Sequence, residues 1–140
     1  AGSFDRSLKI GQVVEVIQDE LSEVGAQNGP IFLTPKDMQL SIITEVKSKP
    51  RTNLTHVKGI TVNTVHGDDM SIQKIVHRLN PQIETMEGAA CMFSCQSAGV
   101  PCLQLRAISN YIEKRNRCSW NISLAIQNLN HEISNFLSQL

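Results

Sequence analysis

The sequence predicts an α/β domain with a mixed, largely parallel sheet flanked by helices. Two observations carry this prediction: β-branched runs alternate along the chain with helix-like segments, and glycine or proline separates one from the next. The chain has 140 residues, of which 41% are apolar and 19% charged. That is the size and composition of one globular domain, so we expect a single domain over 1–140.

The N-terminal half contains two predicted strands with an excursion between them. Residues 12–17 (QVVEVI) and 57–65 (VKGITVNTV) are rich in β-branched residues, which favour strands. Residues 22–36 collect glycines, prolines and an asparagine, too many for regular structure, so we expect a surface excursion. The longer stretch 22–46 is a candidate contact with another subunit. Residues 38–46 are ambiguous, and 48–53 are typical of a turn.

The C-terminal half predicts helices and strands in alternation. Asp68 and Asp69 offer N-caps for a helix that reaches Leu79 and ends before Pro81. A brief strand over 82–86 leads directly into a helix that Gly99 stops. Residues 101–109 predict a strand buried on both faces. Residues 119–140 predict a helix whose apolar stripe covers one sheet face, with Trp120, Ile122, Ile126, Leu129, Ile133, Phe136, Leu137 and Leu140 on the stripe.

Charge and hydropathy exclude several classes of partner. Thirteen basic residues balance thirteen acidic ones, so the basic surface typical of nucleic-acid binding is not expected. No apolar run approaches the roughly 20 residues of a membrane span, and the first residues lack the apolar core of a secretion signal. We therefore expect a soluble, cytoplasmic protein without nucleic-acid or membrane partners.

The four cysteines predict no metal site by their spacing. They form no CxxC pair, and no HxxxH accompanies them, so we expect reduced and mostly buried thiols and no metal. Cys91 and Cys95 would share one helix face, and a metal site there would need one of the four histidines to fold against them.

Two predicted strand ends carry polar residues that could bind a ligand or take part in catalysis. Glu87 lies where a strand passes into a helix; it either interacts with the helix dipole, worth about 0.3–1 kcal/mol, or accepts hydrogen bonds from the two hydroxyls of a ribose. Asn110 follows the strand over 101–109, and its amide either matches the edge of a nucleobase or turns the chain together with Ser109.

Together these motifs resemble a known superfamily. ETMEGAA at 84–90 with GVPCLQLRAISN at 99–110 resembles the purine nucleoside phosphorylase and nucleosidase superfamily, in which the first motif holds ribose and the second the purine. AGSFDRSLKIGQVV at 1–14 is similar to methylthioadenosine/S-adenosylhomocysteine nucleosidases, and TVNTVHG at 61–67 and ISNYIEKRNRCSWNI at 108–122 are similar to futalosine hydrolases. In that family about a third of the domain, with an acid that activates water, precedes the first of these segments. We therefore expect the C-terminal part of such a domain.

The resemblance implies an N-glycosidase that releases hypoxanthine from futalosine in menaquinone biosynthesis, without a metal or organic cofactor. Family members that cut adenine nucleosides have Asp at the position of Asn110, and an amide there is better suited to a 6-oxopurine. Two alternatives stay open: a phosphate-dependent 6-oxopurine nucleoside phosphorylase, and a non-catalytic nucleoside-binding module. The family also implies a homodimer or larger homo-oligomer.

Residue roles follow from the same resemblance. Glu87 would hold the ribose hydroxyls and Asn110 the purine, with Met86 under the sugar; the loop that borders the base would contain Val65, His66 and Gly67. Arg115 and Arg117 either bind a carboxylate on the substrate or belong to a solvated charged loop. We expect Arg106 to be a buried structural partner of an acid, and Trp120 to anchor the core.

Overall fold

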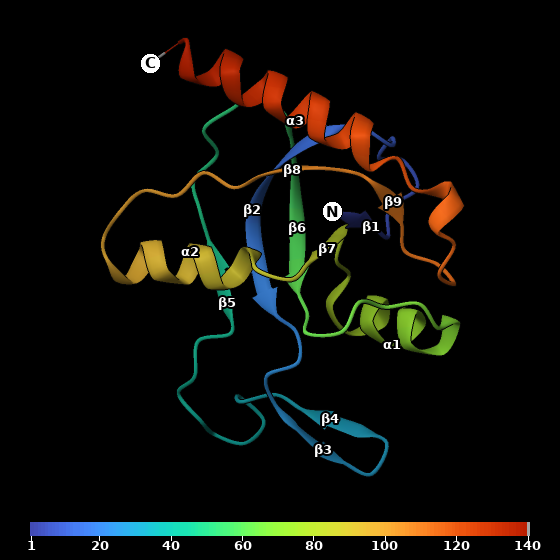
Figure 1. Cartoon of the computed structure of the whole chain (residues 1–140). Helices are drawn as coiled ribbons and strands as arrows, with labels where there is room; N and C mark the ends of the chain where they lie inside the picture. The colour runs from blue at the N-terminus through green and yellow to red at the C-terminus, as the bar shows by residue number, and fades with distance from the viewer. Residues whose placement is uncertain (140) are drawn as a thin grey trace.

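A mixed sheet flanked by three helices forms the domain, so the predicted fold class is confirmed (Figure 1). The computed structural model describes residues 1–139. The main sheet has the strand order β5-β2-β6-β7-β1-β9. Its strands are β1 (Gly2–Ser3), β2 (Val13–Leu21), β5 (Glu45–Lys47), β6 (Thr55–Thr61), β7 (Ile83–Thr85), β8 (Leu105–Ala107) and β9 (Asn110–Tyr111).

The central strands pair in parallel, and the flanks contain both parallel and antiparallel pairs. β2, β6 and β7 run parallel, whereas β1 is antiparallel to β7 and parallel to β9. β8 and β5 both pair antiparallel with β2, β8 near its start and β5 near its end. The polar residues that follow β6 and β7 therefore lie at one edge of the sheet, where open α/β folds bind ligands.

The helices cover the sheet through small apolar clusters. α1 (Asp69–Leu79) packs by Ile75 on Ile60 of β6, and α2 (Gly88–Ser97) packs by Ala89 and Met92 on β5. α3 (Ile122–Leu137) packs by Ala125 on Val13 and Ala107. Among residues 1–139, no helix combines the length and apolar character needed to cross a membrane.

Local signals predicted the two shorter helices well. Asp68 caps α1 by accepting a hydrogen bond from the Ser71 amide, and Asn80, in the left-handed region at φ 45°, ends the helix before Pro81. α2 ends before Gly99, whose φ of +67° suits glycine. These boundaries follow from neighbouring residues alone, which explains why sequence patterns find them.

Four predictions about the fold are wrong, three on secondary-structure elements and one on the burial of the cysteines. The excursion at 22–36 contains a hairpin of β3 (Ala26–Asn28) and β4 (Ile31–Leu33), turned at Gly29 with φ +60°. The strand expected over 101–109 is regular only in β8 and is not buried on both faces, since Leu105 and Arg106 are partly exposed. Cys91 and Cys118 are exposed rather than buried.

The fourth wrong prediction concerns the last helix, α3. Its apolar stripe is only partly covered, because the small Ala125 makes the closest contact with the sheet. Four residues of the predicted stripe face solvent: Ile122, Ile126, Ile133 and Leu137. Leu140 lies outside the described residues.

Candidate active site

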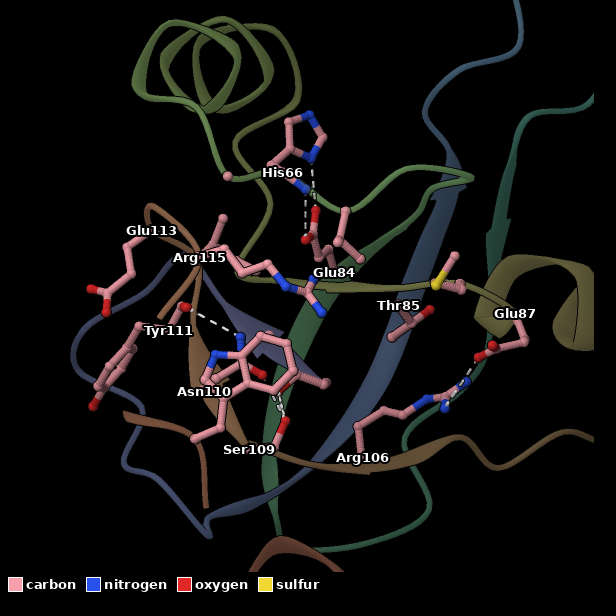
Figure 2. Close-up of a pocket in the computed structure, with 17 residues that line it drawn as sticks. His66, Glu84, Thr85, Glu87, Arg106, Ser109, Asn110, Tyr111, Glu113 and Arg115 are labelled. Atoms are coloured by element: carbon pink, nitrogen blue, oxygen red, sulfur yellow. Dashed lines mark hydrogen bonds and ion pairs between the residues drawn. The ribbon is translucent and has the colours of Figure 1, made fainter. Parts of the chain in front are cut away.

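A cavity of about 490 Å³ opens beyond the ends of β6 and β7, beside the starts of β1 and β9 (Figure 2). Its size is that of a small-molecule site. Seven of the eight predicted site residues line it: Val65, His66, Gly67, Met86, Glu87, Asn110 and Arg115. Arg117 does not; it lies exposed in a 3-10 helix (Arg117–Ser119) outside the cavity. The two strand ends singled out in the sequence therefore meet around one cavity.

Strand register explains why the two ends converge. Gly2 of β1 pairs with Glu84 on one side and with Asn110 on the other, so the three residues form one row across the sheet. A side chain on Gly2 would collide with Ile112 and come within 3.3 Å of the Asn110 amide nitrogen. Glycine at this position keeps the floor of the cavity open.

Glu87 presents its carboxylate to the cavity. It precedes α2 at the N-cap position but makes no side-chain capping hydrogen bond, and its side chain is 73% exposed. The Arg106 guanidinium lies 4.0 Å from this carboxylate (Figure 2). The acid is thus available to accept hydrogen bonds from a ligand beside a fixed positive charge.

A chain of buried polar groups holds Arg106. Its Nε donates to Oε1 of Gln104 over 2.9 Å, and the Gln104 amide donates to the Asp19 carboxylate over 3.1 Å. Asp19 is fully buried and also accepts a hydrogen bond from Thr61, and burial raises the pKa of its carboxyl. Arg106 does have acidic neighbours, but it lines the cavity and is not the buried structural residue we predicted.

The same polar groups fix the start of α2. The Ala89 amide donates to the Thr61 hydroxyl over 2.8 Å, and the Gly88 amide donates to the Thr85 hydroxyl over 3.1 Å. A side chain on Gly88 would collide with Asp19 and Gln104. The glycine of the 84–90 motif therefore permits this close contact.

Glu84 ties the loop after β6 to β7. The buried Glu84 carboxylate lies 2.7 Å from Nδ1 of His66 and accepts the His66 amide over 3.1 Å. Figure 2 shows the pair at the rim of the cavity. Sequence reasoning assigned the loop to the site but missed this pairing, because His66 lies in the loop after β6 and Glu84 on β7, 18 residues further along the chain.

Asn110 has a fixed orientation. The Ser109 hydroxyl donates to its Oδ1 over 2.8 Å, and its Nδ2 donates to the Tyr111 carbonyl over 3.1 Å. An amide has two N–H donors and two acceptor lone pairs, so one of each remains for a ligand. Asn110 begins strand β9 rather than a turn, and it lines the cavity.

Arg115 and Trp120 line another part of the cavity. The Arg115 guanidinium lies 5.1 Å from the centre of the Trp120 ring, and Figure 2 shows it directed across the cavity. The prediction that Trp120 anchors the core is wrong, since its partly exposed ring belongs to the site. The sequence assigned no binding role to the other lining residues, which are Ala1, Gly2, Glu84, Thr85, Arg106, Ser109, Tyr111, Ile112, Glu113 and Trp120.

No protein-family model matches the chain, but individual proteins do. It is 26% identical over 133 residues to a futalosine hydrolase of Streptomyces coelicolor, covering 89% of this chain and 57% of the relative. It is 36% identical over 73 residues to a futalosine hydrolase of Acidothermus cellulolyticus, covering 51% of this chain and 30% of the relative. The chain thus spans less than two thirds of the curated relatives that it matches.

Solved structures of other proteins superpose on the whole of this chain. A 5'-methylthioadenosine/S-adenosylhomocysteine nucleosidase of Helicobacter pylori, crystallised with butyl-thio-DADMe-Immucillin-A, superposes with a TM-score of 0.82 at 19% identity, covering 100% of this chain and 66% of that one. The chain has the fold of this nucleosidase. A futalosine hydrolase of Helicobacter pylori shares this nucleosidase fold with a TM-score of 0.77 at 19% identity, covering 100% of this chain and 65% of that one. The resemblance seen in the sequence is confirmed at the level of the fold.

Proposed function

We propose that this chain carries the nucleoside site of a purine nucleosidase that hydrolyses futalosine and releases hypoxanthine. The observation that carries the proposal is the convergence of Glu87 and Asn110 on one cavity. A carboxylate suits the paired hydroxyls of a ribose, and an amide suits the edge of a purine. The relatives named futalosine hydrolase support this choice of substrate.

The proposed reaction separates charge along the bond between C1′ and the purine N9. As that bond breaks, positive charge develops on the ribosyl ring and negative charge on the leaving purine; water then adds its hydroxyl to C1′ and its proton goes to the base. Glu87 would hold the 2′ and 3′ hydroxyls and stabilise the positive ring, while Asn110 would donate a hydrogen bond to the departing base. Interactions that strengthen as charge develops accelerate the chemical step.

The choice of a 6-oxopurine rests on the amide of Asn110. Its free N–H can donate to N7 or to the O6 carbonyl, whereas the amino group of adenine would have only the single Oδ1 lone pair that Ser109 leaves free. Mismatched buried polar groups cost about 1–3 kcal/mol each, which corresponds to a preference of one to two decades. Hypoxanthine is therefore the favoured base.

The choice of futalosine over a simple nucleoside rests on Arg115. Futalosine carries a benzoate-type carboxylate on its sugar extension, and a guanidinium can bind a carboxylate through two hydrogen bonds. Arg115 lies over the Trp120 ring in the cavity wall, so an aromatic surface accompanies the cation. Arg117 lies outside the cavity, which leaves Arg115 as the residue proposed for this contact.

A phosphate-dependent phosphorylase is the second candidate, because Arg106 and Arg115 both line the cavity and could hold phosphate. One experiment separates the candidates: the purified protein is incubated with futalosine with and without phosphate, and hypoxanthine is measured by chromatography. Release without phosphate supports the hydrolase, and release only with phosphate supports the phosphorylase. Calorimetric binding of hypoxanthine without turnover would identify a nucleoside-binding module instead.

A further inference from the structure

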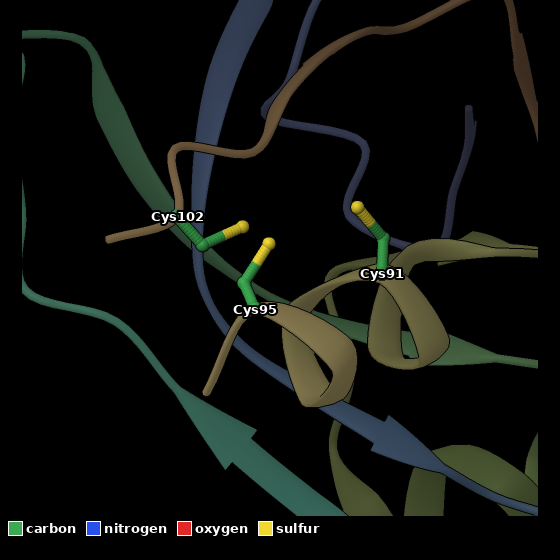
Figure 3. Close-up of side chains that lie close together, drawn as sticks. All are labelled: Cys91, Cys95 and Cys102. Atoms are coloured by element: carbon green, nitrogen blue, oxygen red, sulfur yellow. The ribbon is translucent and has the colours of Figure 1, made fainter. Parts of the chain in front are cut away.

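Three of the four cysteines lie close together away from the cavity, two of them on α2 and the third in the segment that follows it. Cys91 and Cys95 lie one turn apart on the helix, and the segment after Gly99 brings Cys102 next to them (Figure 3). Their sulfur atoms all lie within 4.8 Å of one another, and all three thiols are free. Figure 3 shows the Cys95 and Cys102 side chains pointing toward each other. We expected a metal site here to need one of the four histidines, but none of them belongs to this group.

We propose that these three thiols form a binding site for a thiophilic ion of the Zn²⁺ type, held by three thiolates and one water molecule. Zinc–sulfur bonds are about 2.3 Å long, which places the sulfurs of a tetrahedral site about 3.8 Å apart. Small changes of side-chain rotamer reach this spacing from the one observed. Cys91 is exposed, so water can occupy the fourth position.

Charge around the cluster is compatible with such an ion. Three thiolates and one Zn²⁺ carry a net charge of about −1. Cys102 shares a depression of about 240 Å³ with three basic side chains, those of Lys47, Lys49 and Arg51. Positive charge near a cysteine favours the thiolate, the form that binds metal.

Proton balance makes the binding dependent on pH. Cysteine thiols are mostly protonated at neutral pH, so Zn²⁺ must displace their protons. One Zn²⁺ and three thiols give one zinc tris-thiolate and three protons, and the affinity therefore rises with pH. The bound ion would tie α2 to the segment that precedes β8.

The test uses the purified chain under anaerobic, reducing conditions, with Zn²⁺ as the probe in competition with a chromophoric chelator. We expect one Zn²⁺ per chain and protection of three of the four thiols from a thiol-reactive dye. Cys91→Ser, Cys95→Ser and Cys102→Ser should each weaken binding at least about tenfold. Cys118→Ser is the matched control and should bind normally, because Cys118 is exposed and outside the cluster. Co²⁺ in place of Zn²⁺ should show the visible spectrum of a tetrahedral thiolate site.

Several results would overturn the proposal. These are failure to retain Zn²⁺ against the chelator, full retention by the triple serine variant, or equal loss in Cys118→Ser. A disulfide within the cluster that persists under the reducing conditions would also overturn it. Circular dichroism checks the folding of each variant. Cys91 is exposed, so Cys91→Ser should leave the fold intact, and a loss of Zn²⁺ binding in this variant would indicate the loss of a metal ligand.

Discussion

The guanidinium of Arg106 lies 4.0 Å from the carboxylate of Glu87, and Gln104 holds it there from the interior of the protein. The buried Asp19 in turn fixes the Gln104 amide. The Glu87 carboxylate at the cavity thus faces a cation whose position is set by Gln104 and, through it, by Asp19. This arrangement places a fixed cation beside Glu87 before a ligand binds.

Glu87→Gln keeps the size of the side chain and removes its charge. We expect the rate of hypoxanthine release to fall by at least about 10²–10³-fold, because the developing positive charge on ribose loses its carboxylate. The melting temperature should change little, since the side chain is 73% exposed. Steady-state kinetics and thermal unfolding measure both quantities. A variant that retains the full rate would remove Glu87 from the mechanism.

Asn110→Asp should shift the base preference toward adenine nucleosides. The new carboxylate can accept a hydrogen bond from the amino group of adenine but cannot donate to O6 of hypoxanthine. We expect the ratio of kcat/KM for 6-oxopurine over 6-aminopurine nucleosides to fall by about one to two decades. Asn110→Ala serves as the control for general loss of binding. An unchanged ratio in Asn110→Asp would show that this position does not contact the base.

Gly88→Ala should destabilise the fold. The added Cβ would collide with oxygens of Asp19 and Gln104 and lie 2.9 Å from the Thr85 hydroxyl. We expect a loss of about 1–3 kcal/mol in the free energy of unfolding, measured by urea denaturation. Gly67→Ala is the matched control, because the nearest atom to its Cβ would be 3.8 Å away. Equal stabilities of the two variants would contradict the packing described here.

Asp19 should give stability a measurable dependence on pH. Burial raises the pKa of its carboxyl above the ordinary 3.8, so the folded state binds this proton more tightly than the unfolded state does. The contribution of Asp19 to the free energy of unfolding therefore falls as the pH rises from 3.8 through the folded pKa.

Asp19→Asn removes that titration. The stability difference, wild type minus variant, should decrease with rising pH across this window and then level off. Urea denaturation at a series of pH values measures the difference, which cancels the titration of the other acids. A difference that rises with pH would indicate that hydrogen bonds to the carboxylate outweigh burial.

The sequence by itself determined the elements whose signals are local. Asp68, Asn80 and Pro81 bound α1 because capping depends on residues within one helical turn. The same holds for the two strand ends that carry Glu87 and Asn110, since polar residues after apolar strands indicate a site at the sheet edge.

Only the tertiary structure decided which residues meet. β8 pairs with β2 and brings Arg106 next to the strand that carries Asp19, and the segment after Gly99 brings Cys102 to α2. Likewise, periodicity predicted an amphipathic α3, but packing against Val13 and Ala107 selected Ala125 as the buried contact. Such contacts join residues far apart in the chain, and their formation depends on the packing of the whole sheet rather than on any local pattern.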